Sequence, residues 1–277
     1  VVAGLTPPGM AANRELRYRV YVLDDPTLNA FAYPDGAIFI HTGLLARLDN
    51  EDQLATVLGH EMTHVEHRHM LRHRRAAHNR EVGLTVAAVA AAVVLAAVEA
   101  DELADGHWGR AAAVDLFGDL IVTLGLELAF IAAVNGYGRE LEHEADRGGF
   151  HKLRAAGYDV REAPRVYEIL ADDHGEAGAT ETFFFGSHPR LAERKANAQA
   201  EVAQQGTLPA DPRTDSPNFA ARLAPVIRDE ARRNVTLERP ALACDGFARY
   251  LRLAGEATDA ETVRAERAAL GCEEGEG

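Results

Sequence analysis

The segment LGHEMTHVEHRHMLRH, residues 58–73, contains five histidines within sixteen residues. His60 and His64 are four residues apart, so on an α-helix they project from one face and are close enough to bind one ion. Glu61 would lie beside such an ion without being obliged to bind it. This HExxH string is typical of zinc peptidases, in which two imidazoles bind the metal and the glutamate takes a proton from the metal-bound water.

A catalytic zinc site usually has three protein ligands, so HExxH alone is incomplete. Three further histidines lie close by in the sequence, but a rigid helix would carry each of them away from a metal held at His60 and His64. We therefore expect these three side chains to be solvated or packed rather than metal-bound. They are His67, His69 and His73.

A carboxylate from a later helix is the alternative third ligand. The segment RELEHEAD, residues 139–146, places Glu142 and Asp146 four residues apart on one helical face. One of them can bind the metal while the other accepts a hydrogen bond from the far nitrogen of a metal-bound imidazole. Spacing alone does not choose Glu142 over Glu140 or Glu144.

The elements that would position these residues are strands first and helices afterwards. Strands are expected at residues 17–23, 29–33 and 37–41, because these segments alternate or are β-branched and aromatic, and turn residues separate them. A helix is predicted from Asn50, with Gln53 three positions on as in a capping box, to about Arg75. The pattern predicts a mainly α protein of the α+β class, with a small antiparallel sheet beside the HExxH helix.

Two apolar segments follow, at residues 82–98 and 111–135. The first has seventeen uncharged residues, the lower limit for crossing a bilayer, and seven are alanine, which contributes little to insertion. The second carries Asp115, Asp119 and Glu127 on one stripe, which indicates an amphipathic helix. We predict a helical hairpin that is buried or interfacial and does not span a membrane, although it can rest on a membrane surface.

Composition excludes some partners. The 277 residues contain 29 Lys and Arg against 43 Asp and Glu, a net charge of −14, so nucleic acid is not expected to bind. The length and the 47% hydrophobic content allow one substantial core and a smaller second unit. The chain starts Val-Val-Ala-Gly, and we expect any export signal to lie outside this sequence.

Longer stretches carry a family resemblance. NAFAYPDGAIFIHTGLLARLDNEDQLATVLGHEMTHVEHRH, then GRELEHEAD and then SHPRLAER, together resemble the gluzincin metallopeptidase family of the HtpX, CAAX prenyl endopeptidase and BepA type, over roughly residues 15 to 200. Three linked motifs in this order are far more specific than HExxH alone. In that family the third zinc ligand is the Glu three places before the Ala-Asp pair, which here is Glu142. The family usually has Ser before the Arg of this motif, whereas this chain has Gly138.

The resemblance implies a zinc-dependent endopeptidase. One Zn²⁺ per chain would be held by His60, His64 and Glu142, with one position open for water. The metal would lower the pKa of that water and polarise the scissile carbonyl. Glu61 would accept the proton and later deliver it to the leaving amine.

The resemblance also implies roles for residues around the metal. Asp146 and Arg139 are expected to lie behind the ligands and orient them. By default, Arg194 and Arg139 are each expected to anchor a helix through ion pairs. His188, in SHPRLAER, either approaches the zinc as a fourth ligand or transition-state donor, or has a structural role. A strand is expected to form the edge of the cleft and pair with substrate backbone, although its residues could equally be sheet core. The substrate-binding candidates are Asn29, Ile38, Phe39, Ile40 and His41.

The predicted division is a zinc metallopeptidase domain over residues 1–205, a proline-containing linker over 206–218, and a small helical unit over 219–277. In relatives this last position begins tetratricopeptide-like helical pairs, so the unit could bind a protein partner or merely cap the catalytic domain. Cys244 and Cys272 either form one disulfide or stay as two buried thiols, and the sequence does not choose.

Two functions follow from the resemblance. The first is an endopeptidase that cleaves unfolded or misassembled polypeptide in the bacterial cell envelope, where it would be periplasmic or lipid-anchored. The second is a protease-chaperone that mainly binds assembly intermediates while His188 caps its zinc site.

Overall fold

The computed structural model describes residues 1–6, 16–73, 75–76, 79, 137–172, 191–205 and 218–272. The predicted hairpin of residues 82–98 and 111–135 lies outside these residues, as do His188 and nearly all of the predicted linker. The strands are β1 (Arg19–Leu23), β2 (Ala30–Ala32) and β3 (Ala37–His41). The helices before the predicted hairpin are α1 (Val2–Leu5), α2 (Thr42–Arg47) and α3 (Glu51–Glu66). Those after it are α6 (Arg139–Ala155), the short 3₁₀ helix η1 (Val160–Glu162), α7 (Ala163–Asp172), α9 (Leu191–Gln204), α10 (Phe219–Thr236), α11 (Pro240–Ala254) and α12 (Ala260–Ala269).

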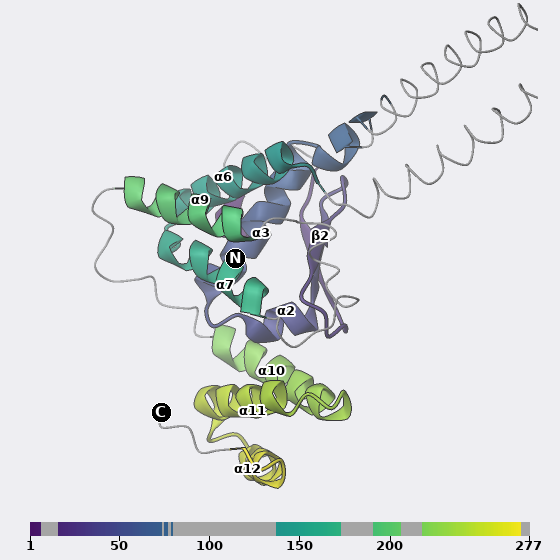
Figure 1. Cartoon of the computed structure of the whole chain (residues 1–277), viewed down its shortest axis with the longest axis vertical. Helices are drawn as coiled ribbons and strands as arrows, with labels where there is room; N and C mark the ends of the chain where they lie inside the picture. The colour runs from purple at the N-terminus through teal and green to yellow at the C-terminus, as the bar shows by residue number, and fades with distance from the viewer. Residues whose placement is uncertain are drawn as a thin grey trace, which may run out of the picture.

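The predicted class is confirmed, because helices dominate the described residues and one small sheet stands on one side of them (Figure 1). The α3 helix lies between the sheet and the layer formed by α6, α7 and α9 (Figure 1). Nearly all of its residues are buried, because it has apolar neighbours on both sides. Among the helices of the described part, none has the length and hydropathy that a bilayer crossing requires.

The sheet has the order β1-β3-β2, and its pairing is mixed. A tight turn that ends at Gly36, with φ +87°, joins β2 and β3 as an antiparallel hairpin. In contrast, β1 pairs with β3 in parallel, so the expectation of an antiparallel sheet is wrong for this pair. The reason is the segment between β1 and β2, which crosses the end of β3. Asp25 accepts a hydrogen bond from the backbone of Gly43 at 2.9 Å, and the hydroxyl of Thr27 lies 2.7 Å from Nδ1 of His41.

The α3 helix begins as predicted, with the side chain of Asn50 accepting a hydrogen bond from the backbone of Gln53 at 2.8 Å. Its end was predicted at about Arg75, and this is wrong. The helix stops at Glu66, and Arg68 adopts a left-handed backbone conformation with φ +53° before residues 69–73 become helical again. The residues after the turn therefore do not continue the direction of α3.

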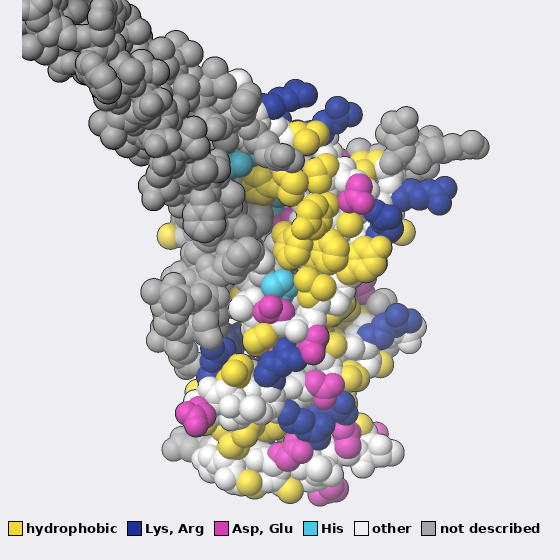
Figure 2. Space-filling view, turned by 90° about the vertical axis from the view of Figure 1, so that its right-hand side faces the viewer, with side chains coloured by type: hydrophobic (Ala, Val, Ile, Leu, Met, Phe, Trp, Pro, Cys, Tyr) yellow, Lys and Arg dark blue, Asp and Glu magenta, His cyan; other side chains and the backbone are white. Residues whose placement is uncertain are grey.

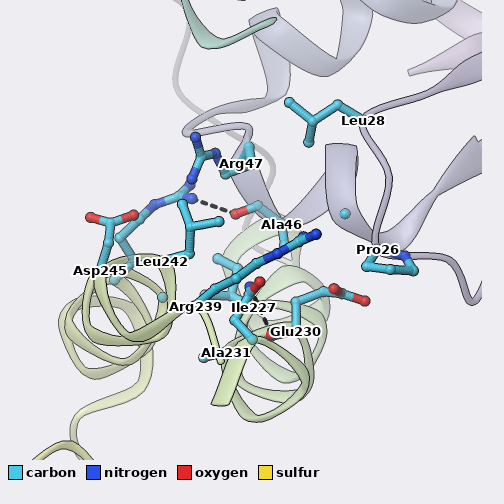
Figure 3. A pocket seen from close by; sticks show the side chains of 14 residues that line it. Pro26, Leu28, Ala46, Arg47, Ile227, Glu230, Ala231, Arg239, Leu242 and Asp245 are labelled. Carbon is cyan, nitrogen blue, oxygen red and sulfur yellow. Dashed lines mark hydrogen bonds between the residues drawn. The ribbon is translucent and has the colours of Figure 1, made fainter. Parts of the chain in front are cut away.

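The C-terminal helices pack on α2, where Arg249 of α11 donates hydrogen bonds to the backbone carbonyls of Ala46 and Leu48. Figure 3 shows the small pocket at this junction, about 30 Å³, between α2 and the pair α10 and α11. Cys244 and Cys272 form a disulfide that ties the residues after α12 to α11. The structure thus selects the disulfide from the two states that the sequence left open.

The outer face of the sheet carries a ladder of aromatic rings. Tyr21, Phe39 and Phe31 stack in sequence with ring centroids 5.1 Å apart, and Tyr33 meets the last two edge-on. Figure 2 views this side of the molecule and shows hydrophobic side chains gathered over the sheet. A contiguous apolar surface of this kind often contacts other molecules.

Candidate active site

Glycines allow α6 to cross α3 at close range. A Cβ atom on Gly149 would lie 2.9 Å from the backbone nitrogen of His60, and one on Gly148 would lie 2.4 Å from Cγ2 of Thr63. Any larger residue at these positions would separate the two helices. Because the backbones approach so closely, the first turn of α6 reaches the histidines of α3.

Two imidazoles and one carboxylate converge at this crossing. Nε2 of His60 lies 2.9 Å from Nε2 of His64, and the two nitrogens lie 3.7 and 3.4 Å from the carboxylate oxygens of Glu142. All three side chains are buried. Ligands of a tetrahedral zinc ion, with bonds of about 2.0–2.1 Å, stand roughly 3.3 Å apart. The observed separations bracket that value, so the three residues fit a zinc ion without rearrangement of the backbone.

Glu61 and Tyr137 stand beside the group. Glu61 is only 2% exposed and follows His60 on α3. The ring of Tyr137 stacks on that of His64, with centroids 4.2 Å apart and planes at 22°. Burial and the nearby charges of Glu61 and Glu142 raise the pKa of the Tyr137 hydroxyl above its usual value, so it stays protonated and can donate a hydrogen bond. No sequence signal marks Tyr137, which stands just before the acidic motif.

The far nitrogen of His60 faces a carboxylate. Nδ1 of His60 lies 2.9 Å from Oδ1 of Asp146, one turn after Glu142 on α6. Burial would raise the pKa of Asp146, but Arg194 and His60 hold that pKa well below its usual range. An ionised Asp146 accepts the Nδ1 proton of His60, which places the lone pair of the ring on Nε2, the nitrogen that faces His64 and Glu142.

Arg194, on α9, binds both carboxylates. Its guanidinium lies 2.6 Å from Asp146 and 3.0 Å from Glu142, and its side chain is 5% exposed. Burial opposes its charge, yet Asp146, Tyr167 and Glu142 keep the pKa of Arg194 well above its ordinary value. The sequence predicted only that Arg194 anchors its helix. In the structure it anchors α9 to the two carboxylates of the candidate metal site. Its burial results from the packing of α9 against α6 and α7, which the sequence does not reveal.

The far nitrogen of His64 faces another histidine. Nδ1 of His69 lies 2.9 Å from Nδ1 of His64, although a continuous helix would have carried His69 away. The turn at Arg68 returns it to the ligand. Nε2 of His69 lies 3.4 Å from Oε2 of Glu144, on α6. Burial lowers the pKa of His69 to about 4, against the opposing charge of Glu144, so the ring is neutral at pH 7.

The other predicted residues are placed differently. The structure does not bring Arg139 to the ligands; its side chain is 67% exposed and pairs with Glu193 of α9. The preceding Gly138 is the N-cap residue of α6 and has no side-chain cap, yet the helix starts where the motif requires.

The expected edge position of residues 38–41 is wrong, because β3 is the central strand and its backbone pairs on both sides. Ile38 and Ile40 pack in the two halves of the core, which agrees with the sheet-core alternative. Phe39 belongs to the aromatic ladder on the outer face, His41 contacts Thr27, and Asn29 is buried before β2.

Comparison with known proteins covers the part of the chain that contains these residues. The model of peptidase family M48 matches residues 7–202, more than half of the chain. The beta-barrel assembly-enhancing protease of Escherichia coli K12 is 29% identical over 187 residues, which cover 68% of this chain and 35% of that protein. The mitochondrial metalloendopeptidase OMA1 is 31% identical over 183 residues in Schizosaccharomyces pombe, covering 65% of this chain and 45% of that one. The Arabidopsis thaliana protein of the same name is 28% identical over 194 residues, covering 70% and 33%. The chain thus spans less than half the length of these relatives.

Proposed function

The chain belongs to peptidase family M48, and on this premise we propose that it is a zinc-dependent endopeptidase. The observation that carries the proposal is the convergence of two buried imidazole nitrogens and one buried carboxylate at tetrahedral ligand spacing, from His60, His64 and Glu142. If the imidazoles are neutral, the group has three negative charges, on Glu61, Glu142 and Asp146, and one positive charge, on Arg194. Its net charge is then −2. A divalent cation balances that excess.

A zinc ion held by His60, His64 and Glu142 would supply a Lewis acid that polarises the scissile carbonyl and acidifies a water molecule. Glu61 would accept a proton from the attacking water and deliver it to the leaving amine. Asp146 keeps His60 in the tautomer whose Nε2 can bind the ion. The hydroxyl of Tyr137, kept protonated by its surroundings, is a donor for charge that develops on the substrate oxygen.

The substrate class follows from the sheet. Of its two edge strands, β2 is the one that packs against the HExxH helix. An extended polypeptide can add to such an edge through backbone hydrogen bonds, which selects for unfolded segments more than for particular side chains. We therefore propose that the protein cleaves unfolded or misassembled polypeptides and that β2 (Ala30–Ala32) is the strand that receives them.

A cell-envelope location is proposed on two observations. The disulfide between Cys244 and Cys272 suits an oxidising compartment. Among the relatives are proteins named beta-barrel assembly-enhancing protease. The chaperone-like alternative, with His188 capping the zinc, is less favoured because the family and the relatives described above are all named as peptidases.

The test uses an unstructured protein such as casein, incubated with the chain before and after chelator treatment and after zinc is restored. We expect cleavage that chelation stops and zinc restores. Glu61→Gln should bind zinc normally and cleave at least about 100-fold more slowly, because the proton acceptor is lost. Glu142→Gln should lose zinc, while Glu140→Gln, a matched change on the exposed side of the same helix turn, should retain both zinc and activity. Cleavage at the rate of the unaltered chain, either by Glu61→Gln or in the presence of chelator, would contradict the proposal.

A further inference from the structure

His69 lies directly behind the candidate metal group. It is fully buried at 0% exposure, and its ring meets that of His64 edge-on, with centroids 4.8 Å apart. The two Nδ1 atoms are 2.9 Å apart, a hydrogen-bond distance that can hold only one proton. The position of that proton decides what each ring can do.

The geometry fixes the proton on His64. Nε2 of His64 points at His60 and Glu142, so this nitrogen must be unprotonated when it binds an ion. Its proton is then on Nδ1 and is donated to Nδ1 of His69. A neutral His69 that accepts there carries its own proton on Nε2, the atom that lies 3.4 Å from Oε2 of Glu144.

We propose that His69 and Glu144 are positioning residues for the metal ligand His64. His69 fixes the tautomer and ring orientation of His64, and the carboxylate of Glu144, 3.4 Å from Nε2 of His69, favours a proton on that nitrogen through its charge rather than through a hydrogen bond. This inference rests on the proposed metal site. Metal-bound histidines generally donate their second N–H to an acceptor that orients them. Here one ligand, His60, donates to a carboxylate, and the other, His64, donates to a neutral imidazole.

A neutral acceptor suits this side of the site. Glu61 and Glu142 are buried at the candidate metal site and Asp146 is 11% exposed, so a further carboxylate against His64 would add to their repulsion. His69 accepts the proton without adding charge. The negative charge is moved outward to Glu144, whose side chain is 35% exposed and lies 2.7 Å from the guanidinium of Arg72.

The same residues suggest a rival arrangement, in which His67, His69 and Glu144 bind a second ion. Such an ion would need the lone pair of His69 Nε2, so the proton of His69 would move to Nδ1. That N–H would then face the Nδ1–H of His64 at 2.9 Å with no acceptor between them. A second ion is therefore incompatible with a zinc-binding neutral His64, and the positioning role is favoured.

The test compares substitutions at His69 in the full chain. His69→Leu removes the acceptor, whereas His69→Asn keeps an amide oxygen near the position of Nδ1. His67→Leu is the control, because His67 contacts Glu144 but belongs only to the rival ion site. Zinc affinity is measured by competition with a chromophoric chelator, and zinc per chain by elemental analysis of protein whose fold has been checked by circular dichroism.

We expect His69→Leu to weaken zinc binding roughly 10- to 100-fold. His69→Asn should recover most of that loss, and His67→Leu should bind one zinc as the unaltered chain does. Imidazole ¹H–¹⁵N NMR of the zinc-loaded chain should show a slowly exchanging Nδ1 proton on His64 that His69→Leu abolishes. A purely structural role for His69 would not predict recovery by Asn.

Three results would overturn the inference: unchanged affinity in His69→Leu, no recovery in His69→Asn, or two zinc ions per chain with one lost in His67→Leu. If His69→Leu does not fold, zinc affinity is measured in Glu144→Leu instead, because the Glu144 side chain is partly exposed and its replacement disturbs the core less. There an affinity loss of roughly threefold or more supports the role, and unchanged affinity refutes it. Failure of the metal site itself would look different, since the unaltered chain would then bind no zinc and Glu142→Gln would change nothing.

Discussion

Arg249 tests whether the C-terminal helices are part of the catalytic unit or only tethered to it. Its guanidinium donates to the carbonyls of Ala46 and Leu48, the latter at 2.8 Å, and its side chain is 9% exposed. Arg249→Met keeps most of the aliphatic length but removes both donors. A hydrogen bond that involves a charged group contributes about 1.5–3 kcal/mol. The pair with Asp49 adds little, because that carboxylate is 57% exposed.

The two lost bonds therefore sum to about 3–6 kcal/mol. Burial disfavours the guanidinium charge, which lowers the pKa of Arg249 and offsets part of this gain. We expect a net destabilisation of about 3 kcal/mol in urea unfolding followed by circular dichroism. Hydrogen exchange should quicken in α2 as well as in α10 and α11, because α2 supplies the two carbonyls.

The matched control is Arg252→Met, on the exposed side of the same helix, for which we expect a change below about 0.5 kcal/mol. Equal effects of the two substitutions would refute this account of the junction. So would faster exchange in α10 and α11 with unchanged exchange in α2. Either result would count against the expectation that residues 219–277 cap the catalytic domain.

Reduction of the Cys244–Cys272 disulfide should lower the free energy of unfolding by roughly 3.6 kcal/mol at most, the chain-entropy value for its 28-residue separation, while zinc content stays constant. Urea titration with and without reductant measures this, and an equal loss of zinc would contradict it. Asp146→Asn should weaken zinc affinity roughly 10- to 100-fold, because His60 loses its charged acceptor, and chelator competition should show it. The metal-free chain should lose stability as the pH falls from about 6.5 to 4, because burial lowers the pKa of His69 to about 4 and the unfolded chain binds that proton first. The loss is at most about 3 kcal/mol, and urea unfolding across this pH range should show a flatter slope in His69→Asn.

Local signals in the sequence predicted the elements well. The three strands and the cap of α3 depend on neighbours within a few residues, so alternation, turn residues and the Asn50–Gln53 pair were sufficient. The parallel pairing of β1 with β3 was not predictable in this way. Strand direction depends on where the connecting segment crosses, and that crossing is held by contacts between Asp25 and Gly43, eighteen positions apart.

The end of α3 was missed for a different reason. Helical periodicity continues in the sequence after Glu66, and the left-handed residue of the turn is Arg68 rather than the glycine that usually marks such a position. A left-handed conformation at a non-glycine residue costs about 1–2 kcal/mol. It persists here because His69, directly after the turn, is buried against His64 and lies beside Glu144.

The HExxH string predicted which atoms bind the metal but not what balances their charge. Arg194 lies 3.0 Å from Oε2 of Glu142, whereas the other oxygen, Oε1, faces His64 at 3.4 Å. An ion bound through Oε1 would leave the pair between Oε2 of Glu142 and the guanidinium intact, but it would take Nε2 of His60, which lies 3.3 Å from the same guanidinium. A lysine could not serve both carboxylates in this way, because only the planar fork of arginine reaches Glu142 and Asp146 with separate nitrogens. The arginine of the SHPRLAER segment is thus as much a part of the metal site as the glutamate that it binds.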